Sequence, residues 1–272
     1  MKNYIRIGFF AMIAILQQSC NKELNVSNEF IDLTEDQATQ QDLLESNEVE
    51  VSEQVEASFS AVSTRTYPTR TWSAPKGTYP NTLTVDYGSM GVVGPYGHIR
   101  KGKMLITLTA PINTVNAIRT VEHDNFYIDE VKVEGTVYLT NKGLNTFNQP
   151  YFDRVVSNRK LTFPGGKSLY WNAIQTITQI EGFNTPLNKF DNVFTITDVS
   201  SGVNRIGKTF AITTSIPLVY KTICAWVVEG IVNISVDQKS ITVNYGDGSC
   251  NNEASVTLPN GTVIEVKIRR WW

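Results

Sequence analysis

The chain has 272 residues, 41% of them hydrophobic and 10% aromatic, which is enough for one large or two small domains with a packed core. Its net charge is only -2, but residues 21–60 hold eleven Asp or Glu against one Lys, whereas residue 61 onward holds 21 Lys or Arg against 15 Asp or Glu. The basic residues are spread without a dense cluster, which argues against nucleic acid as a partner.

The first 19 residues have the pattern of a secretory signal. Lys2 and Arg6 precede an uncharged, mostly apolar run at residues 7–16, which is shorter than the roughly 20 residues that a spanning helix needs. Ser19 and Cys20 then resemble the cleavage site of a bacterial lipobox, which implies a signal peptide over 1–19 and a lipid on Cys20. Two or three acyl chains would anchor the chain stably. The alternative is an ordinary cleavable signal with a cysteine near the cut.

No Asp follows Cys20, so the residue associated with retention in the inner membrane of enterobacteria is missing. We therefore expect a lipid anchor in the outer membrane, with the periplasmic and the surface face both open.

Residues 20–78 predict an acidic, disordered tether between the lipid and a folded domain. They are rich in Glu, Asp, Gln, Ser and Thr, and a segment of low hydrophobicity and high net charge buries too little apolar area to offset its ordering entropy. A stretch over 35–56 has enough apolar residues for a transient helix. The functional alternative is a docked peptide or a partner-binding region.

Residues 79–272 predict one all-β globular domain. Short β-branched runs alternate with period two and are separated by Gly, Asn, Asp and Pro, for example at 104–109, 131–140, 174–180 and 227–236. Several runs echo one another, as 83–88 does 241–246. We expect an antiparallel β-sandwich or a barrel-like meander with internally related strand units.

Cys224 and Cys250 are the other two cysteines, and an even pair in an exported chain favours a disulfide. No CxxC spacing is present and the chain has two histidines, so neither a metal site nor a cofactor is predicted. The run Asp247-Gly248-Ser249 has oxygen ligands that calcium accepts, but it lacks the spacing of a known calcium loop and is typical of an Asp-Gly turn.

Two sets of residues are candidates for chemistry. Carboxylates that a glycan-active hydrolase could use lie in strand contexts, three of them directly before a glycine. They are Asp124, Glu134, Glu181 and Glu229. Aromatic side chains could stack on a ligand, although most strand aromatics belong to a core. They are Trp72, Tyr96, Trp171, Trp271 and Trp272.

Several motifs together resemble a family of uncharacterised Bacteroidota lipoproteins. They are the lipobox, the acidic segment, Tyr87-Gly88, the turn at 100–103, the run at 124–127 and the closing run at 244–250. The resemblance covers most of residues 82–268 and implies an envelope location without an established activity. We therefore expect a lipid-anchored, non-catalytic module that binds a ligand or a partner, such as a glycan or another envelope protein. The alternative is a glycan-active hydrolase.

Overall fold

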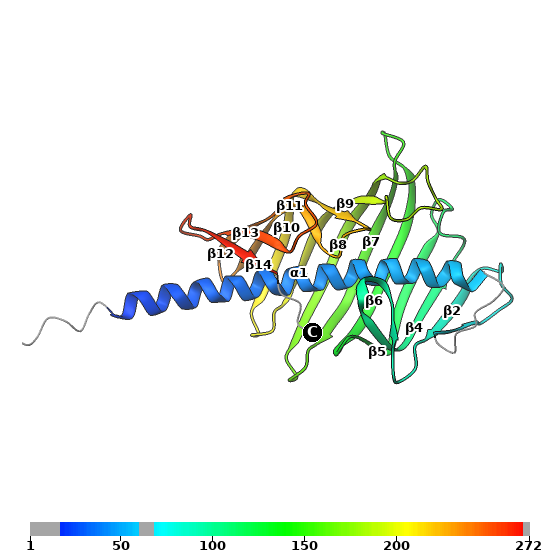
Figure 1. Cartoon of the computed structure of the whole chain (residues 1–272), viewed down its shortest axis with the longest axis horizontal. Coiled ribbons are helices and arrows are strands. Elements are labelled where there is room, and N and C mark those ends of the chain that lie inside the picture. The colour runs from blue at the N-terminus through cyan, green and yellow to red at the C-terminus, as the bar shows by residue number, and fades with distance from the viewer. Residues whose placement is uncertain (1–16, 60–67, 269–272) are drawn as a thin grey trace, which may run out of the picture.

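A computed structural model describes residues 17–59 and 68–268 of the chain, with side chains from residue 29 onward (Figure 1). It contains one long helix, α1 (Gln17–Phe59), one short 3-10 turn, η1 (Pro95–Gly97), and fourteen strands. The strands are β1 (Thr69–Trp72), β2 (Asn81–Asp86), β3 (Val92–Val93), β4 (Ile99–Leu108), β5 (Ile118–Ile128), β6 (Val131–Leu144), β7 (Pro150–Thr162), β8 (Ser168–Glu181), β9 (Val193–Val203), β10 (Thr209–Lys221), β11 (Val227–Val236), β12 (Lys239–Asp247), β13 (Glu253–Thr257) and β14 (Val263–Lys267).

All the strands belong to one antiparallel sheet in which neighbours along the chain are neighbours in space. The order runs from β1 through β2 and β4 to β14, and β3 pairs with β4 beside this path. The predicted all-β antiparallel fold is confirmed, and of the two expected arrangements it is the meander. The sheet is not closed.

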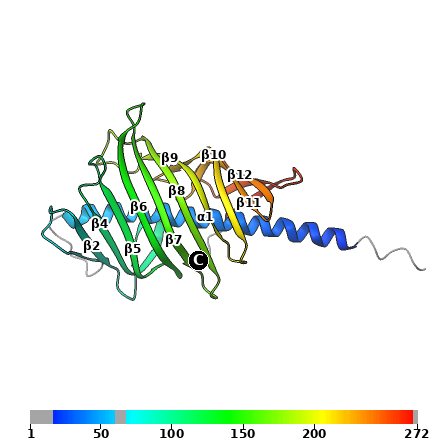
Figure 2. The same cartoon turned by 180° about the vertical axis from the view of Figure 1, so that it is seen from behind.

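Alternation along each strand places one set of side chains in the core. On β8, Leu169, Trp171, Ala173, Gln175 and Ile177 are buried, while the residues between them face solvent. This period of two is what a half-buried strand requires. Most strands of the sheet thus present a buried face, and that face packs around α1 (Figure 2).

The helix α1 corrects the prediction of a disordered tether over 20–78. Residues 29–59 are helical and packed on the sheet, and Thr69–Trp72 form β1 of that sheet. Nine consecutive residues, 33–41, are buried, which means that every side of the helix is covered there. Figure 1 shows the N-terminal part of α1 projecting beyond the sheet. Within the described ranges, no helix has the length and apolar character that crossing a bilayer requires.

Composition failed here because basic residues outside α1 supply the counter-charges of its acidic side chains. Four of the ion pairs that join α1 to these residues involve arginine and are named here the clamp pairs. They are Asp36–Arg205, Glu45–Arg154, Glu48–Arg119 and Glu50–Arg100. A docked peptide was the alternative that the sequence left open. The structure has such an arrangement, and the docked segment is α1 of the same chain.

The clamp pairs and two flanking hydrogen bonds of α1 follow the order of the strands in reverse. Gln37 near the start of the packed part accepts a hydrogen bond from Tyr245 on β12, and Gln54 near the end accepts one from Arg70 on β1 at 2.7 Å. Between them, the clamp partners come from the β9–β10 loop, β7, β5 and β4. The helix therefore crosses the sheet from β12 to β1, and the strands named here contact successive parts of it.

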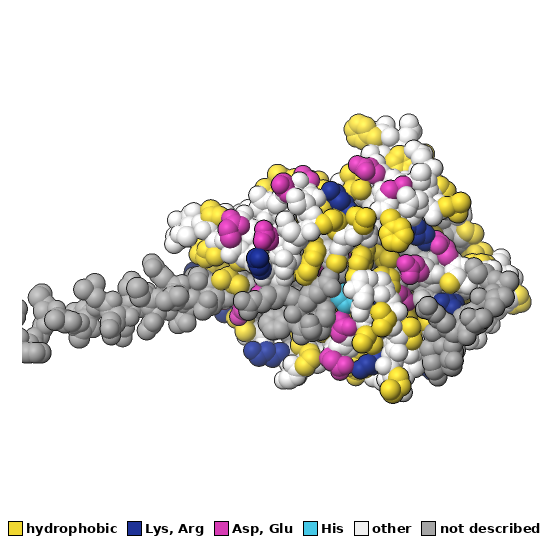
Figure 3. Space-filling model, in the orientation of Figure 1, with side chains coloured by type: hydrophobic (Ala, Val, Ile, Leu, Met, Phe, Trp, Pro, Cys, Tyr) yellow, Lys and Arg dark blue, Asp and Glu magenta, His cyan; other side chains and the backbone are white. Residues whose placement is uncertain are grey.

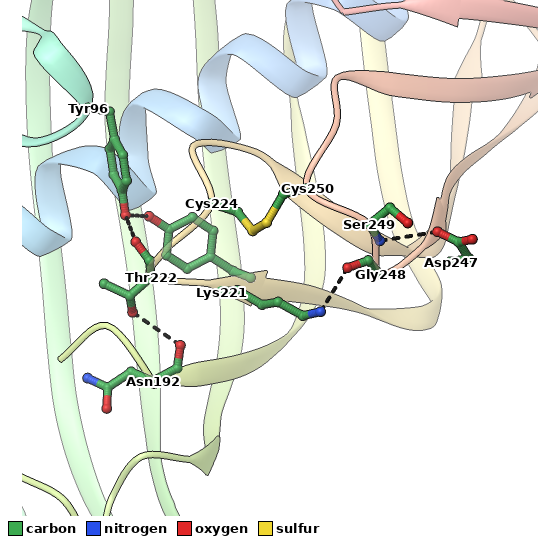
Figure 4. Close-up of a disulfide and its surroundings, with 10 residues drawn as sticks. Tyr96, Asn192, Lys221, Thr222, Cys224, Asp247, Gly248, Ser249 and Cys250 are labelled. Carbon is green, nitrogen blue, oxygen red and sulfur yellow. Dashed lines mark hydrogen bonds between the residues drawn. A yellow bond between two sulfur atoms is a disulfide. The ribbon is translucent and has the colours of Figure 1, made fainter. Parts of the chain in front are cut away.

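The loop that carries η1 passes over α1 and closes the side away from the sheet. The Tyr96 hydroxyl donates to the backbone oxygen of Thr222 and shares a hydrogen bond with Tyr220, both at 2.6 Å (Figure 4). A side chain at Gly94 in this loop would lie 2.6 Å from both Arg100 and Glu50, so the loop sits directly on a clamp pair. The loop acts as a strap that holds the helix in place.

The predicted disulfide between Cys224 and Cys250 is confirmed. It joins the β10–β11 connection, next to the anchorage of the strap, to the β12–β13 connection (Figure 4). The run from Asp247 to Ser249 forms a turn in which the Ser249 amide donates to Asp247 Oδ1 at 3.1 Å, and Lys221 Nζ donates to the backbone oxygen of Gly248 at 2.8 Å. These bonds support the interpretation as an Asp-Gly turn.

Breaking one clamp pair should destabilise the whole domain. Arg154 is fully buried and Glu45 nearly so, and Arg154→Ala leaves Glu45 without its counter-charge, which should lower the free energy of unfolding by about 3–5 kcal/mol. Replacing both residues by Leu should recover most of this loss. The matched control is Lys160→Ala, which breaks the partly exposed contact with Glu134 and should cost less than about 1 kcal/mol. Equal losses in urea unfolding for Arg154→Ala and Lys160→Ala would contradict the clamp.

Candidate functional site

The aromatic residues selected from the sequence do not form one exposed platform. Trp171 is 1% exposed and belongs to the core, so its interpretation as a surface for stacking is wrong. Trp72 is partly buried and its ring lies 5.6 Å from that of Phe59 on α1. Tyr96 is the strap residue, and Trp271 and Trp272 lie outside the described residues.

The candidate carboxylates are distributed over four strands, with Asp124 on β5, Glu134 on β6, Glu181 on β8 and Glu229 on β11. None of them lines either of the two cavities described below. Glu134 is held by Lys132 at 3.2 Å and Lys160 at 3.9 Å. The hydrolase alternative stays a prediction without a supporting observation in the described residues.

The glycines after these acids explain the repeated Glu-Gly pattern. Gly135 and Gly230 have φ of 99° and 113°, and each sits where the pairing register shifts, on β6 and β11. A Cβ at Gly135 would lie 2.6 Å from the backbone of Arg159, and one at Gly230 would lie 2.6 Å from the backbone of Pro217. The pattern therefore marks β-bulges, as positive φ and close backbone approach require.

His123, beside Asp124, is not placed for acid-base work on a ligand. Its Nδ1 donates to the backbone oxygen of Gly135 at 3.0 Å. Burial lowers the pKa of His123 to about 4, and the charge of Arg159 adds to this effect. The imidazole is neutral at physiological pH and serves the packing of the bulge.

The larger of two cavities lies between α1 and the sheet and has a volume of about 260 Å³. Its position is near the ends of β6, β8 and β10, where the β4–β5 and β8–β9 connections contribute to the mouth. A smaller cavity of about 180 Å³ lies near the β9–β10 loop and is bounded by the clamp pair of Asp36 and Arg205.

The larger cavity has two chemically different walls. Its helix wall comes from residues spaced three or four apart on one face of α1, namely Glu45, Glu48, Val49, Ser52 and Glu56. Its sheet wall supplies most of the large apolar side chains, which are Ile112, Leu139, Phe152, Ile177 and Phe194. Polar residues of the sheet complete it, among them Arg119, Arg154, Gln179, Lys189, Asn192, Tyr220 and Thr222. An apolar body with a polar end matches this division of the walls.

Paired charges make the helix wall polar without a large net charge. Glu45, Glu48 and Glu56 each form an ion pair with a basic residue that also lines the cavity. Arg119 is 4% exposed, and its Nε has no hydrogen-bond partner among the described residues. That N–H is a buried donor without a described partner, on a side chain that lines the cavity.

A buried polar network supports Arg154 from below. Gln175 accepts from Arg154 Nε at 2.7 Å and donates to Gln41 of α1 at 3.0 Å. Asp198 on β9 is 3% exposed and accepts from the Ser200 hydroxyl at 2.6 Å. Burial raises the pKa of Asp198 to about 6, against the opposing effects of its hydrogen bonds and of Arg154. The network fixes the position of the Arg154 side chain, which lines the cavity.

Sequence reasoning missed this site because its two walls come from segments that were assigned different roles. The helix wall was assigned to a tether, and the sheet wall consists of ordinary apolar strand residues. A usable signal was the charge asymmetry, since an acidic segment followed by a basic domain of the same chain favours contact between them.

The raised pKa of Asp198 gives the stability a pH dependence that Asp198→Asn should remove. Between pH 6 and pH 4, which is close to the pKa of Asp in the unfolded chain, the folded carboxyl holds a proton that the unfolded chain releases. The free energy of unfolding of the wild type therefore rises on acidification. His123 acts in the opposite direction over its own window, from about 6.5 to about 4. The wild type and Asp198→Asn share the effect of His123, so the difference between their free energies of unfolding isolates the contribution of Asp198.

Urea unfolding at pH 6 and pH 4 should therefore show the stability of Asp198→Asn falling relative to wild type on acidification. The relative loss should reach up to about 3 kcal/mol, since one pKa unit corresponds to about 1.36 kcal/mol. Parallel pH profiles for the two proteins would show that Asp198 has an ordinary pKa.

Comparisons with known proteins provide no relative of this chain. No family model matches it, and no curated protein or solved structure matches it either. What can be inferred about function therefore comes from the residues themselves.

Proposed function

We propose that this chain is a lipid-anchored protein of the cell envelope, in the outer membrane, and acts as a non-catalytic ligand-binding module. Its ligand is an amphiphile with an apolar body and an oxygen-bearing head. The observation that carries the proposal is the cavity between α1 and the sheet, whose lining combines five large apolar side chains of the sheet side with three ion pairs between the sheet side and the helix. A free glycan fits less well, because five apolar side chains line the sheet wall.

The position of α1 links the proposed anchor to the proposed site. Cys20 lies within the range of α1, and the same helix carries Glu45, Glu48 and Val49 into the cavity wall. At 1.5 Å per residue, the 25 residues from Cys20 to Glu45 span about 38 Å of helix. A continuous helix clamped by buried pairs would hold the cavity at a defined distance along the helix from the lipid-modified Cys20.

Within the cavity, Arg119 is the residue proposed to bind the head of the ligand. Its Nε–H is unused by the described residues, and its guanidinium is held by Glu48. Ile177 and Phe194 on neighbouring strands would contact the apolar body. Burial of such a body would stabilise the complex by roughly 25 cal/mol for each Å² removed from water.

The anchor itself is tested by the mass of the N-terminal peptide. Protein purified from a bacterial envelope should begin at Cys20, and that residue should carry a diacylglycerol and usually an amide-linked acyl chain. Cys20→Ala should block the modification and release the protein from membranes. An unmodified Cys20, or a mature chain that begins at another residue, would contradict the anchor.

The ligand is tested with a photoreactive fatty acid, diazirine-labelled decanoate, on the full chain in vesicles. Adducts should map to residues of the cavity, and unlabelled decanoate should compete. Ile177→Trp fills the cavity and should lower the adduct yield at these residues at least about tenfold, the equivalent of 1.4 kcal/mol. Ile174→Trp, on the opposite face of β8 and 68% exposed, is the matched control and should leave the yield unchanged.

Near-ultraviolet circular dichroism of both variants checks that they fold. Adducts scattered over the surface, or equal yields for the two tryptophan variants, would contradict the ligand site.

A further inference from the structure

The connections between strands alternate between two edges of the sheet, as in any antiparallel meander. The β4–β5, β6–β7, β8–β9 and β10–β11 connections share one edge, and the cavity opens there because Ile112, Lys189, Asn192 and Thr222 from three of them line it. In Figure 1 the β6–β7 connection projects at the top of the molecule.

Large apolar side chains project from this edge into solvent. Leu187 is fully exposed, Phe147 is 79% exposed and Phe190 is 72% exposed. Together with three further exposed residues they are named here the apolar edge. Its members are Val115, Leu144, Phe147, Leu187, Phe190 and Ile223. In Figure 3 hydrophobic side chains stand at the top of the molecule, with acidic and basic side chains among them.

These side chains contribute little to the core, since most of their surface stays in water. They sit on separate connections that protrude from the sheet, an arrangement that presents isolated apolar tips instead of a flat patch. Such tips suit a fluid lipid surface, which can close around each of them, more than the fixed shape of a folded partner.

Charges of both signs lie near the apolar edge, and Glu181 and Asp191 flank the exposed residues of the β8–β9 connection. Lys142 pairs with Asp153 at 3.5 Å, and Lys189 pairs with Glu56. The edge therefore has no excess of cations that would select anionic lipids. The chemistry favours a zwitterionic bilayer, entered through apolar contact.

The direction of α1 is compatible with such contact. The strands cross α1 in both ribbon views, so the connections project to the side of the helix axis (Figures 1 and 2). A helix that lies along a membrane surface, starting at an anchored residue, would turn one edge of the sheet toward that surface.

We propose that the apolar edge inserts into the bilayer that anchors the chain and sets the mouth of the cavity against the lipid. This inference rests on the proposed function, because a ligand with an apolar body would then enter the cavity directly from the membrane. Phe147, Leu187 and Phe190 are the inserting residues, and Ile112 and Asn192 lie at the passage from edge to cavity.

The test places a polarity-sensitive fluorophore on single cysteines introduced into the full chain on phosphatidylcholine vesicles. Phe147→Cys and Leu187→Cys probe the apolar edge. Val93→Cys and Val263→Cys, at positions 63% and 58% exposed near the opposite edge, are the controls. Cys224 and Cys250 are joined in the disulfide, and the proposed lipid occupies Cys20, so each variant has one free thiol.

Labels at residues 147 and 187 should shift their emission to the blue and be quenched by lipids that carry a quencher in the acyl region, whereas labels at 93 and 263 should report water. Raising the salt concentration should leave the quenching unchanged. Equal, water-like emission at all four positions on vesicle-bound protein would overturn the inserting edge.

The double variant Phe147→Ser with Leu187→Ser separates this inference from the proposed function. It should lose most adducts when the photoreactive decanoate is supplied from vesicles and retain them when it is supplied from water. If the wild-type chain forms no adducts in the cavity with decanoate from either source, the ligand site is refuted. Unchanged adducts from vesicles in the double variant would refute the inserting edge while leaving the ligand site intact.

Discussion

Buried ion pairs between one helix and the sheet that surrounds it are the interaction on which the rest of this structure depends. A buried charge is costly unless it is paired and hydrogen-bonded. Here the four acids of the clamp pairs meet arginines from the β9–β10 loop, β7, β5 and β4. Because each partner comes from a different place in the meander, the helix and the order of the strands specify each other.

The same interaction creates the cavity. Glu45 and Glu48 belong both to the clamp pairs and to the helix wall, and their arginines line the cavity together with the apolar residues of the sheet. Without the helix, the buried face of the sheet would be an open apolar trough crossed by arginines. The helix therefore converts a structural surface into a bounded site, and the strap through Tyr96 keeps it there.

Part of this arrangement was predictable from the sequence. The alternation in residues 79–272 predicted the antiparallel strands, and the pair of Cys224 and Cys250 predicted the disulfide. The helix was missed because its stability does not reside in its own composition. Asp36 and Glu50 are unfavourable in a core by themselves and acceptable only beside Arg205 and Arg100, whose proximity depends on the folded sheet. The burial of Trp171 likewise depends on which face of β8 is turned toward the core, and that face is set by the folded sheet.

Hydrogen exchange of the backbone amides in residues 33–51 tests the central claim most directly, since it reports whether α1 is a clamped core element. The account predicts that these amides exchange as slowly as those of the central strands β6 to β8, because opening the helix would expose the clamp pairs and so require unfolding of the domain. Exchange within seconds in residues 33–51, while β6 to β8 remain protected, would show that the helix leaves the sheet freely and would contradict the account.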